Sequence, residues 1–131
     1  MCKAILYAAN TQLQTVAEGG IVNFGTVIRQ MGGSIELSGG NVNISGVGYY
    51  NADASFSFVA EATGVYTIQL YKDGTPIVGA RASATVVADA TVNMAIPFVV
   101  RNTCCCDSTI TAVISGGDAT VSVASITIEK K

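Results

Sequence analysis

Residues 50–58 alternate between apolar and polar side chains, and this alternation constrains the fold more than any other feature of the chain. Successive side chains of a β-strand point to opposite faces, so the run predicts a strand with one apolar and one polar face. The apolar positions are Tyr50, Ala52, Ala54, Phe56 and Phe58. The same period recurs over residues 92–100 and 110–114. Each of these predicted strands therefore offers one face to a core.

The composition favours strands throughout the chain. Val and Ile supply 28 of the 131 residues and Thr another 13, against four Leu. Such β-branched side chains pack well on a pleated surface, and no long helix is expected. Paired glycines punctuate the apolar runs, and Asp73-Gly74 has the sequence of a type I′ hairpin turn. Pro76, just after that turn, indicates an edge strand or the entry to a strand.

The predicted strands cover most of the sequence. They are residues 4–9, 12–16, 21–28, 34–38, 41–45, 49–61, 65–72, 76–87, 91–101, 108–115 and 120–129. In the last strand the apolar phase changes near Val123, so either a bulge lies there or two strands meet. About ten short antiparallel strands in a single domain over residues 1–131 predict an all-β sandwich or jelly roll.

Charge and composition exclude several functions. The chain has no His, which removes the commonest general base and metal ligand, so we expect neither catalysis nor a cofactor. Only 12% of residues are charged against 50% hydrophobic, and this balance predicts self-association. With a net charge of −2 and scattered Lys and Arg, nucleic-acid binding is not expected. No apolar run reaches the ~20 residues of a membrane span, and the N-terminal run is too short for a signal peptide.

Three segments carry a resemblance to a known family. Residues 46–58, GVGYYNADASFSF, open a long strand with a glycine and an aromatic pair. Residues 64–80, GVYTIQLYKDGTPIVGA, add the Asp-Gly turn and a Pro-x-x-Gly sequence, and residues 120–130, TVSVASITIEK, close the chain. Over nearly its whole length the chain resembles the C1q/TNF-like jelly-roll family. The resemblance implies a homotrimer whose inner sheets pack around a threefold axis.

A narrower resemblance comes from three shorter segments. These are LYAANT at residues 6–11, IVNFG at residues 21–25 and VRNTCCC at residues 100–106. They are similar to small stand-alone proteins of phages and prophages of gut Firmicutes, which are usually structural components of the particle. The same fold forms the C-terminal head of BclA-type spore-surface glycoproteins, but the collagen-like Gly-X-Y stalk of those proteins is missing here.

The polar face of the strand at residues 49–61 is the candidate trimer interface. Its side chains are Tyr49, Asn51, Asp53, Ser55 and Ser57. In the resembling fold the corresponding strand faces the trimer axis, which implies a hydrogen-bonded interface with Tyr49 as an amphipathic residue at its end. The alternative is an ordinary solvent-exposed face.

The cysteine run Cys104-Cys105-Cys106 has two interpretations. As small apolar side chains the three thiols would pack in a core or a subunit contact. On an extended strand Cys104 and Cys106 share one face, so thiols from three subunits could instead bind a soft metal such as zinc. The cysteines are expected to be reduced, because a disulfide framework spreads its cysteines along the chain. The first interpretation is preferred, and no metal ligand is assigned.

Carboxylates and tyrosines supply weaker candidates. The acidic residues could pair for glycoside hydrolysis or bind calcium, but turn formation and solvation explain them better. They are Asp53, Glu61, Asp73, Asp89, Asp107 and Asp118. Three tyrosines, Tyr7, Tyr66 and Tyr71, could form a sugar-binding surface, but scattered aromatics on strands more often pack in a core or at an edge.

These observations lead to one functional hypothesis and one alternative. The hypothesis is a non-enzymatic virion protein of a phage or prophage, a trimeric head decoration, fibre or appendage component. It would be assembled in the bacterial host cytoplasm, and it would dock on capsid, portal or tail proteins. The alternative is an adhesin head that binds a carbohydrate or a receptor, such as a host surface glycan, at a fibre tip or spore surface.

Overall fold

The computed structural model describes residues 4–102 and 107–130, which fold into eleven β-strands without a helix. The strands are β1 (Ile5–Asn10), β2 (Gln14–Val16), β3 (Thr26–Met31), β4 (Ile35–Ser38), β5 (Asn41–Ile44), β6 (Gly48–Ala60), β7 (Gly64–Lys72), β8 (Thr75–Val86), β9 (Thr91–Asn102), β10 (Ser108–Ser115) and β11 (Ala119–Lys130). Within these described residues, no helix is long and apolar enough to cross a membrane.

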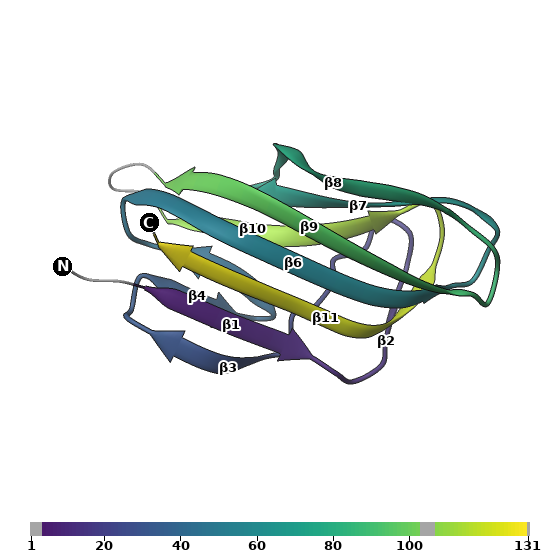
Figure 1. Ribbon diagram of the computed structural model, residues 1–131, viewed down its shortest axis with the longest axis horizontal. Coiled ribbons are helices and arrows are strands. Elements are labelled where there is room, and N and C mark those ends of the chain that lie inside the picture. Colours follow the sequence, from purple (N-terminus) through teal and green to yellow (C-terminus); the bar gives the residue numbers. More distant parts are fainter. Residues whose placement is uncertain (1–3, 103–106, 131) are drawn as a thin grey trace.

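The strands form two antiparallel sheets packed face to face (Figure 1). The six-stranded sheet has the order β3-β1-β11-β6-β9, and β2 pairs with β11 beside this path. The five-stranded sheet has the order β4-β5-β10-β7-β8. The first and last strands are neighbours at the middle of the first sheet, where Ile5 lies opposite Glu129 and Asn10 opposite Ala124. The all-β sandwich predicted from the alternation is confirmed.

The core lies between the sheets and is built from the apolar positions of the alternating runs. On β6 every second residue from Tyr50 to Ala60 is buried, and β9 buries the matching positions from Met94 to Val100. Two ring contacts cross the core, between Phe24 and Phe56 with centroids 5.8 Å apart and between Phe58 and Tyr66 at 5.7 Å. Burying each Phe side chain contributes about 1.5–3 kcal/mol to folding. The alternation of apolar residues along the strands therefore favours the packing of the two sheets face to face.

Two local predictions are confirmed. Asp73 and Gly74 both have positive φ, 53° and 82°, as the two central residues of a type I′ turn require, and they connect β7 to the edge strand β8. The phase change in the last strand is a bulge, because the register between β11 and β6 shifts between Val121 and Val123. The extra residue returns the later apolar residues of β11 to the core.

The predicted strand at residues 21–28 is wrong in its first half. Val22 and Phe24 are fully buried, but they belong to an irregular connection, in which the Val22 amide donates to the Ala112 carbonyl and the Phe24 amide to the Gly40 carbonyl. The alternating apolar residues of this segment are therefore buried between the sheets, although the segment does not pair with a neighbouring strand as a regular β-strand does. The side chain of Asn23 accepts a 2.6 Å bond from the Gly25 amide, and β3 begins after this turn at Thr26.

Candidate interaction face and edge cavity

The five predicted interface residues lie together on the solvent side of the six-stranded sheet. They occupy alternate positions of β6, between buried residues that point to the core. Tyr49 is 54% exposed, and Asp53 and Ser55 are also exposed, whereas Asn51 and Ser57 are half-buried. The structure therefore places Tyr49, Asn51, Asp53, Ser55 and Ser57 on one surface, as the alternation predicted. Their role as a trimer interface remains a prediction.

The register of the sheet extends this surface across the neighbouring strands. Ser55 lies opposite Ser125 of β11 and Ala95 of β9, and Asp53 lies opposite Thr127 and Pro97. Directly opposite residues of antiparallel strands share a face of the sheet. The middle of this face is therefore built from short hydroxyl side chains of β6 and β11. We call it the sheet face, defined by Asn51, Asp53, Ser55, Ser57, Ser125 and Thr127.

A hollow lies on the sheet face where β11 bulges. It has a volume of about 290 Å³ and is lined by Ser55, Ser57 and Val123 together with residues 93–95 of β9. Val123, at the bulge, is 39% exposed. The bulge therefore places an apolar side chain in a hollow that also carries the hydroxyl groups of Ser55 and Ser57.

Tyr49 and Arg101 form one corner of this side of the sheet. They lie opposite each other on β6 and β9, and the Arg101 guanidinium carbon is 5.7 Å from the centre of the Tyr49 ring. This is the distance of a cation–π contact, worth about 0.5–1 kcal/mol at an exposed site. The contact holds the guanidinium against the sheet.

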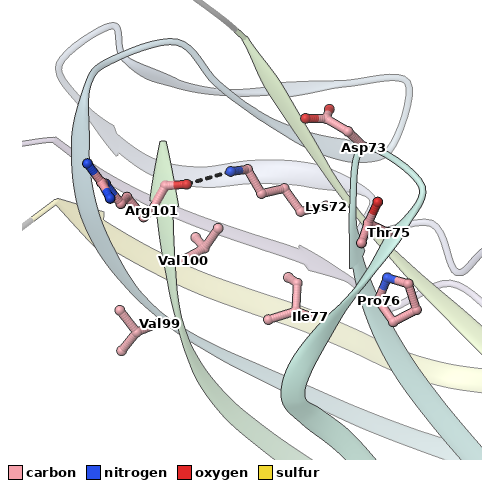
Figure 2. Close-up of a pocket in the computed structure, with 8 residues that line it drawn as sticks. All are labelled: Lys72, Asp73, Thr75, Pro76, Ile77, Val99, Val100 and Arg101. Carbon is pink, nitrogen blue, oxygen red and sulfur yellow. Dashed lines mark hydrogen bonds between the residues drawn. The ribbon is translucent and has the colours of Figure 1, made fainter. Parts of the chain in front are cut away.

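A larger cavity, of about 500 Å³, opens between the edges of the two sheets beside Arg101. Figure 2 shows its lining, with the β7–β8 hairpin on one side and the end of β9 on the other. The Lys72 ammonium donates a 2.6 Å hydrogen bond to the Arg101 carbonyl and so links the two sheets across it. The lining residues are Lys72, Asp73, Thr75, Pro76, Ile77, Val99, Val100 and Arg101.

The cavity exists because β8 departs from β7 just after the hairpin turn. The register shifts between Gln69 and Tyr71, where the ladder is interrupted. The side-chain amide of Gln69 fills the gap, donating to the carbonyls of Leu70 at 2.9 Å, Ile77 at 3.0 Å and Ala80 at 3.2 Å. Sequence reasoning missed this cavity, since only the Pro-x-x-Gly sequence after the turn hinted at an irregular β8.

The cysteine run Cys104-Cys105-Cys106 lies outside the described residues, so both of its interpretations remain open. The strands on either side are joined by a 2.7 Å hydrogen bond from the Ser108 hydroxyl to the side-chain oxygen of Asn102, both buried. In the part of the chain that the structure describes, no three His, Cys, Asp or Glu side chains gather into a group that could hold a metal ion.

Several carboxylates take part in turns and loops. One Asp73 oxygen accepts a 2.9 Å bond from the Thr109 amide, which connects the hairpin to β10. One Asp118 oxygen accepts a 2.9 Å bond from the Glu18 amide in the loop after β2. Asp89 has a positive φ of 67° in the turn before β9. These three carboxylates lie in turns or loops, whereas Asp53 lies on the outward face of β6.

The tyrosines considered for a sugar-binding surface do not come together. Tyr66 is fully buried, and its hydroxyl bonds to the backbone of two turns, at Ala62 and Asp118. Tyr7 lies on the six-stranded sheet and is 38% exposed, whereas Tyr71 lies on the five-stranded sheet. A shared aromatic platform for a sugar is therefore not formed by these three residues.

Comparison with known proteins identifies the fold. No family model matches the chain, and no curated protein matches it. Among solved structures, Eiger TNF from S. frugiperda has a TM-score of 0.77 at 9% identity, covering 99% of this chain and 92% of that one. The globular domain of zebrafish complement 1qA has a TM-score of 0.69 at 10% identity, with 98% and 96% covered. The PRD1 vertex protein P5 has a TM-score of 0.61 at 10% identity, with 99% and 98% covered.

These likenesses extend over almost the whole chain, and they confirm the fold that the sequence resemblance implied. The chain has the C1q/TNF-like jelly-roll fold.

Proposed function

We propose that this C1q/TNF-like jelly roll is a non-enzymatic structural protein of a phage or prophage particle, and that it works as a homotrimer. The observation that carries the proposal is the sheet face. Its central side chains are Ser, Thr and Asn with one carboxylate, Asp53, and its position on the six-stranded sheet follows from the register. Glu129 lies opposite Asn51 beside them. Short hydroxyl and amide side chains let a second copy approach closely, and hydrogen bonds exchanged with that copy offset the cost of removing them from water.

The composition supports self-association independently of the fold. A chain with 12% charged residues has few groups to keep an exposed surface solvated. Many exposed apolar side chains of the described strands occur on or beside the six-stranded sheet, among them Tyr7, Met31 and Val99. Burying these residues in a trimer reduces the apolar surface exposed to water.

The particle assignment draws on the vertex protein among the similar structures. We propose that the loops at the ends of the sandwich contact capsid, portal or tail proteins, and that the assembled trimer decorates the head or builds a fibre or appendage. Its work is mechanical and adhesive, because it depends on complementary surfaces and not on a reacting group. An adhesin head is the alternative, but the separated positions of the three tyrosines do not favour it.

The native mass of the purified protein tests the trimer. Light scattering under reducing conditions, with and without a chelator, is expected to give about three times 13.4 kDa in both samples. A monomer would overturn the trimer proposal. A trimer that falls apart only with chelator would assign a metal to the cysteine run in place of simple packing.

A second experiment tests the particle assignment. Particles purified from a bacterial host that carries the gene are analysed by mass spectrometry and labelled with an antibody against the protein. We expect the protein to copurify with intact particles and the label to lie at a fixed position. Its absence from particles of confirmed infectivity would overturn the virion role while leaving the trimer untouched.

A further inference from the structure

The edge cavity is formed by an arch in β8, which we define as residues 77–80. The arch stands opposite Leu70 alone, where the register between β7 and β8 shifts. The side-chain amide of Gln69 donates to the carbonyls of Ile77 and Ala80, so it holds both ends of the arch. Interruptions of an edge strand occur beside binding sites and also as protection against edge pairing. The lining of the cavity decides between these two roles.

The floor of the cavity is apolar. Val100 is 4% exposed and belongs to the core, and Ile77 of the arch packs against that core. Pro76 and Val99 add exposed apolar side chains to the lining. The volume of about 500 Å³ lies within the range of ligand sites, about 300–1,000 Å³. Because a hydrocarbon group displaces water from such walls favourably, they suit a ligand with an apolar body.

The Lys72 ammonium reaches across this cavity. It donates a 2.6 Å hydrogen bond to the Arg101 carbonyl, as Figure 2 shows. An ammonium group has three donors, and a neutral carbonyl does not balance its charge. The adjacent carboxylate, that of Asp73, directs one oxygen to the Thr109 amide at 2.9 Å. A bound anion can therefore take a second donor of Lys72 and neutralise this half-buried cation.

Arg101 contributes its backbone to the cavity and not its guanidinium. In Figure 2 the guanidinium lies away from Lys72, and it is 5.7 Å from the centre of the Tyr49 ring. A residue of an antiparallel strand directs its N–H and its C=O to the same side. The Arg101 N–H therefore faces the same free edge of β9 as the carbonyl that binds Lys72. One ammonium and one amide match the two oxygens of a carboxylate.

We infer that the edge cavity binds a small amphiphilic carboxylate of the fatty-acid class. Its carboxylate pairs with Lys72, and its hydrocarbon chain lies on Ile77 and Val100. A ligand in this position contacts the β7–β8 hairpin and β9 together, and by binding only the folded chain it stabilises the sandwich. The site lies within one chain, so the inference goes beyond the proposed function and does not depend on the trimer.

Calorimetric titration of the native chain with decanoate, kept below its micelle concentration, tests the inference. We expect one decanoate to bind per chain. Butyrate keeps the carboxylate but has a short chain, and decyltrimethylammonium keeps the chain but reverses the charge. Each should bind at least about tenfold more weakly, because butyrate buries fewer methylene groups and the cation cannot pair with Lys72. Absence of decanoate binding, or equal affinity for either comparison compound, would overturn the inference.

Variants assign the binding to this cavity. Lys72→Met keeps most of the side-chain stem and removes the charge, so it should weaken decanoate binding at least about tenfold. Lys130→Met is the control, because Lys130 is a half-buried lysine on β11 outside the lining, and it should stay within about threefold of the native chain. Equal effects of these two changes would reject the role of Lys72.

A second cavity variant guards against misfolding of the first. Ile77→Phe places a larger side chain in the cavity, so it should also weaken decanoate binding at least about tenfold. Circular dichroism checks the fold of each variant. If Lys72→Met does not fold, Ile77→Phe gives the decision. Unchanged decanoate affinity in a folded Ile77→Phe chain would place the ligand elsewhere and overturn the inference.

The native mass separates this inference from the trimer. Light scattering should give the same mass with and without decanoate, because the ligand occupies a site within one chain. A mass that falls when decanoate is added would assign the cavity to a contact between copies and overturn the inference. A monomeric chain that binds decanoate through Lys72 would overturn the trimer and leave the inference standing.

Discussion

The hydroxyl of Tyr66 donates a 2.6 Å hydrogen bond to the carbonyl oxygen of Asp118, 52 residues further along the chain. Tyr66 lies near the start of β7, and Asp118 lies in the turn before β11. The same hydroxyl accepts a 3.3 Å bond from the Ala62 amide, and the ring stacks on Phe58. One buried side chain thus joins two turns at one end of the sandwich. It also connects β7 of the five-stranded sheet to the start of β11 in the six-stranded sheet.

We predict that Tyr66→Phe lowers the free energy of unfolding by about 1–2 kcal/mol, because the Asp118 carbonyl and the Ala62 amide lose their partner in a largely dry site. Urea unfolding followed by circular dichroism measures the effect. Tyr71→Phe is the matched control, since Tyr71 is half-buried on the solvent side of β7. An equal loss in both variants would argue against the role of the buried hydroxyl.

The second prediction concerns Gly116, in the turn that also contains Asp118. Gly116 has a φ of 106°, and a Cβ at this position would collide with the Val65 carbonyl oxygen. Gly74 also has a positive φ, 82°, but a Cβ there would meet nothing within 4 Å. Gly74→Ala should therefore cost only the backbone strain, about 1–2 kcal/mol.

Gly116→Ala should cost that strain and a backbone displacement as well, roughly 3 kcal/mol or more in all. Thermal unfolding of the two variants gives the comparison. If both melt at the same temperature, the close approach of Gly116 to Val65 does not limit the packing of this end of the sandwich.

Most of the fold could be predicted because alternate side chains of a strand point to the same face, so the strand that packs on a core must carry an apolar residue at every second position. On β6, β9 and β10 the apolar positions of the sequence are the buried positions of the structure. The prediction failed at residues 21–25 because side chains can be buried in an alternating pattern without the backbone forming a strand. Val22 and Phe24 are buried like strand residues, but the hydrogen bonds of this segment go to scattered partners, which hydropathy does not report.

The interruption of β8 could not be predicted either, and it carries a third prediction. Three carbonyl oxygens converge on the side-chain amide of Gln69. In Gln69→Glu a carboxylate replaces the donating amide at nearly the same volume, so these carbonyls lose their donor and face a negative charge. We expect a loss of about 2–3 kcal/mol in the free energy of unfolding.

Gln12→Glu is the control for this change, because Gln12 is exposed and its side chain lies in a loop. It should leave the urea midpoint nearly unchanged. If Gln69→Glu were equally silent, the Gln69 amide would not be what holds the displaced part of β8, and the edge cavity would need another explanation.

The candidate surface was partly readable from the sequence. The alternation in residues 49–57 predicted which five side chains share a face, and the structure places them so. It could not predict their neighbours, because pairing across a sheet joins residues such as Ser55, Ser125 and Ala95 that are far apart in the chain. The hollow at the β11 bulge and the cavity between the sheet edges depend on the arrangement of the strands and therefore appear only in three dimensions.

The last prediction tests which of the two sheets forms the trimer interface. Ser55 is at the centre of the sheet face, and Ser55→Arg would place three long guanidinium side chains where the proposed trimer interface packs short hydroxyl groups. Removing these charges from water and making room for their side chains costs several kcal/mol, so the mass by light scattering should fall to that of a monomer. Circular dichroism should remain that of a folded β-protein, because the Ser55 side chain points to solvent within one chain.

Thr111→Arg is the matched control on the opposite sheet. Thr111 is also a small hydroxyl residue on a central strand, β10, and it points away from the core between the buried Ile110 and Ala112. We expect this variant to stay trimeric, since the five-stranded sheet faces outward in the proposed assembly. Dissociation by Thr111→Arg with retention of the trimer by Ser55→Arg would reverse the roles of the two sheets, and the interface would have to be sought on β4, β5, β10, β7 and β8.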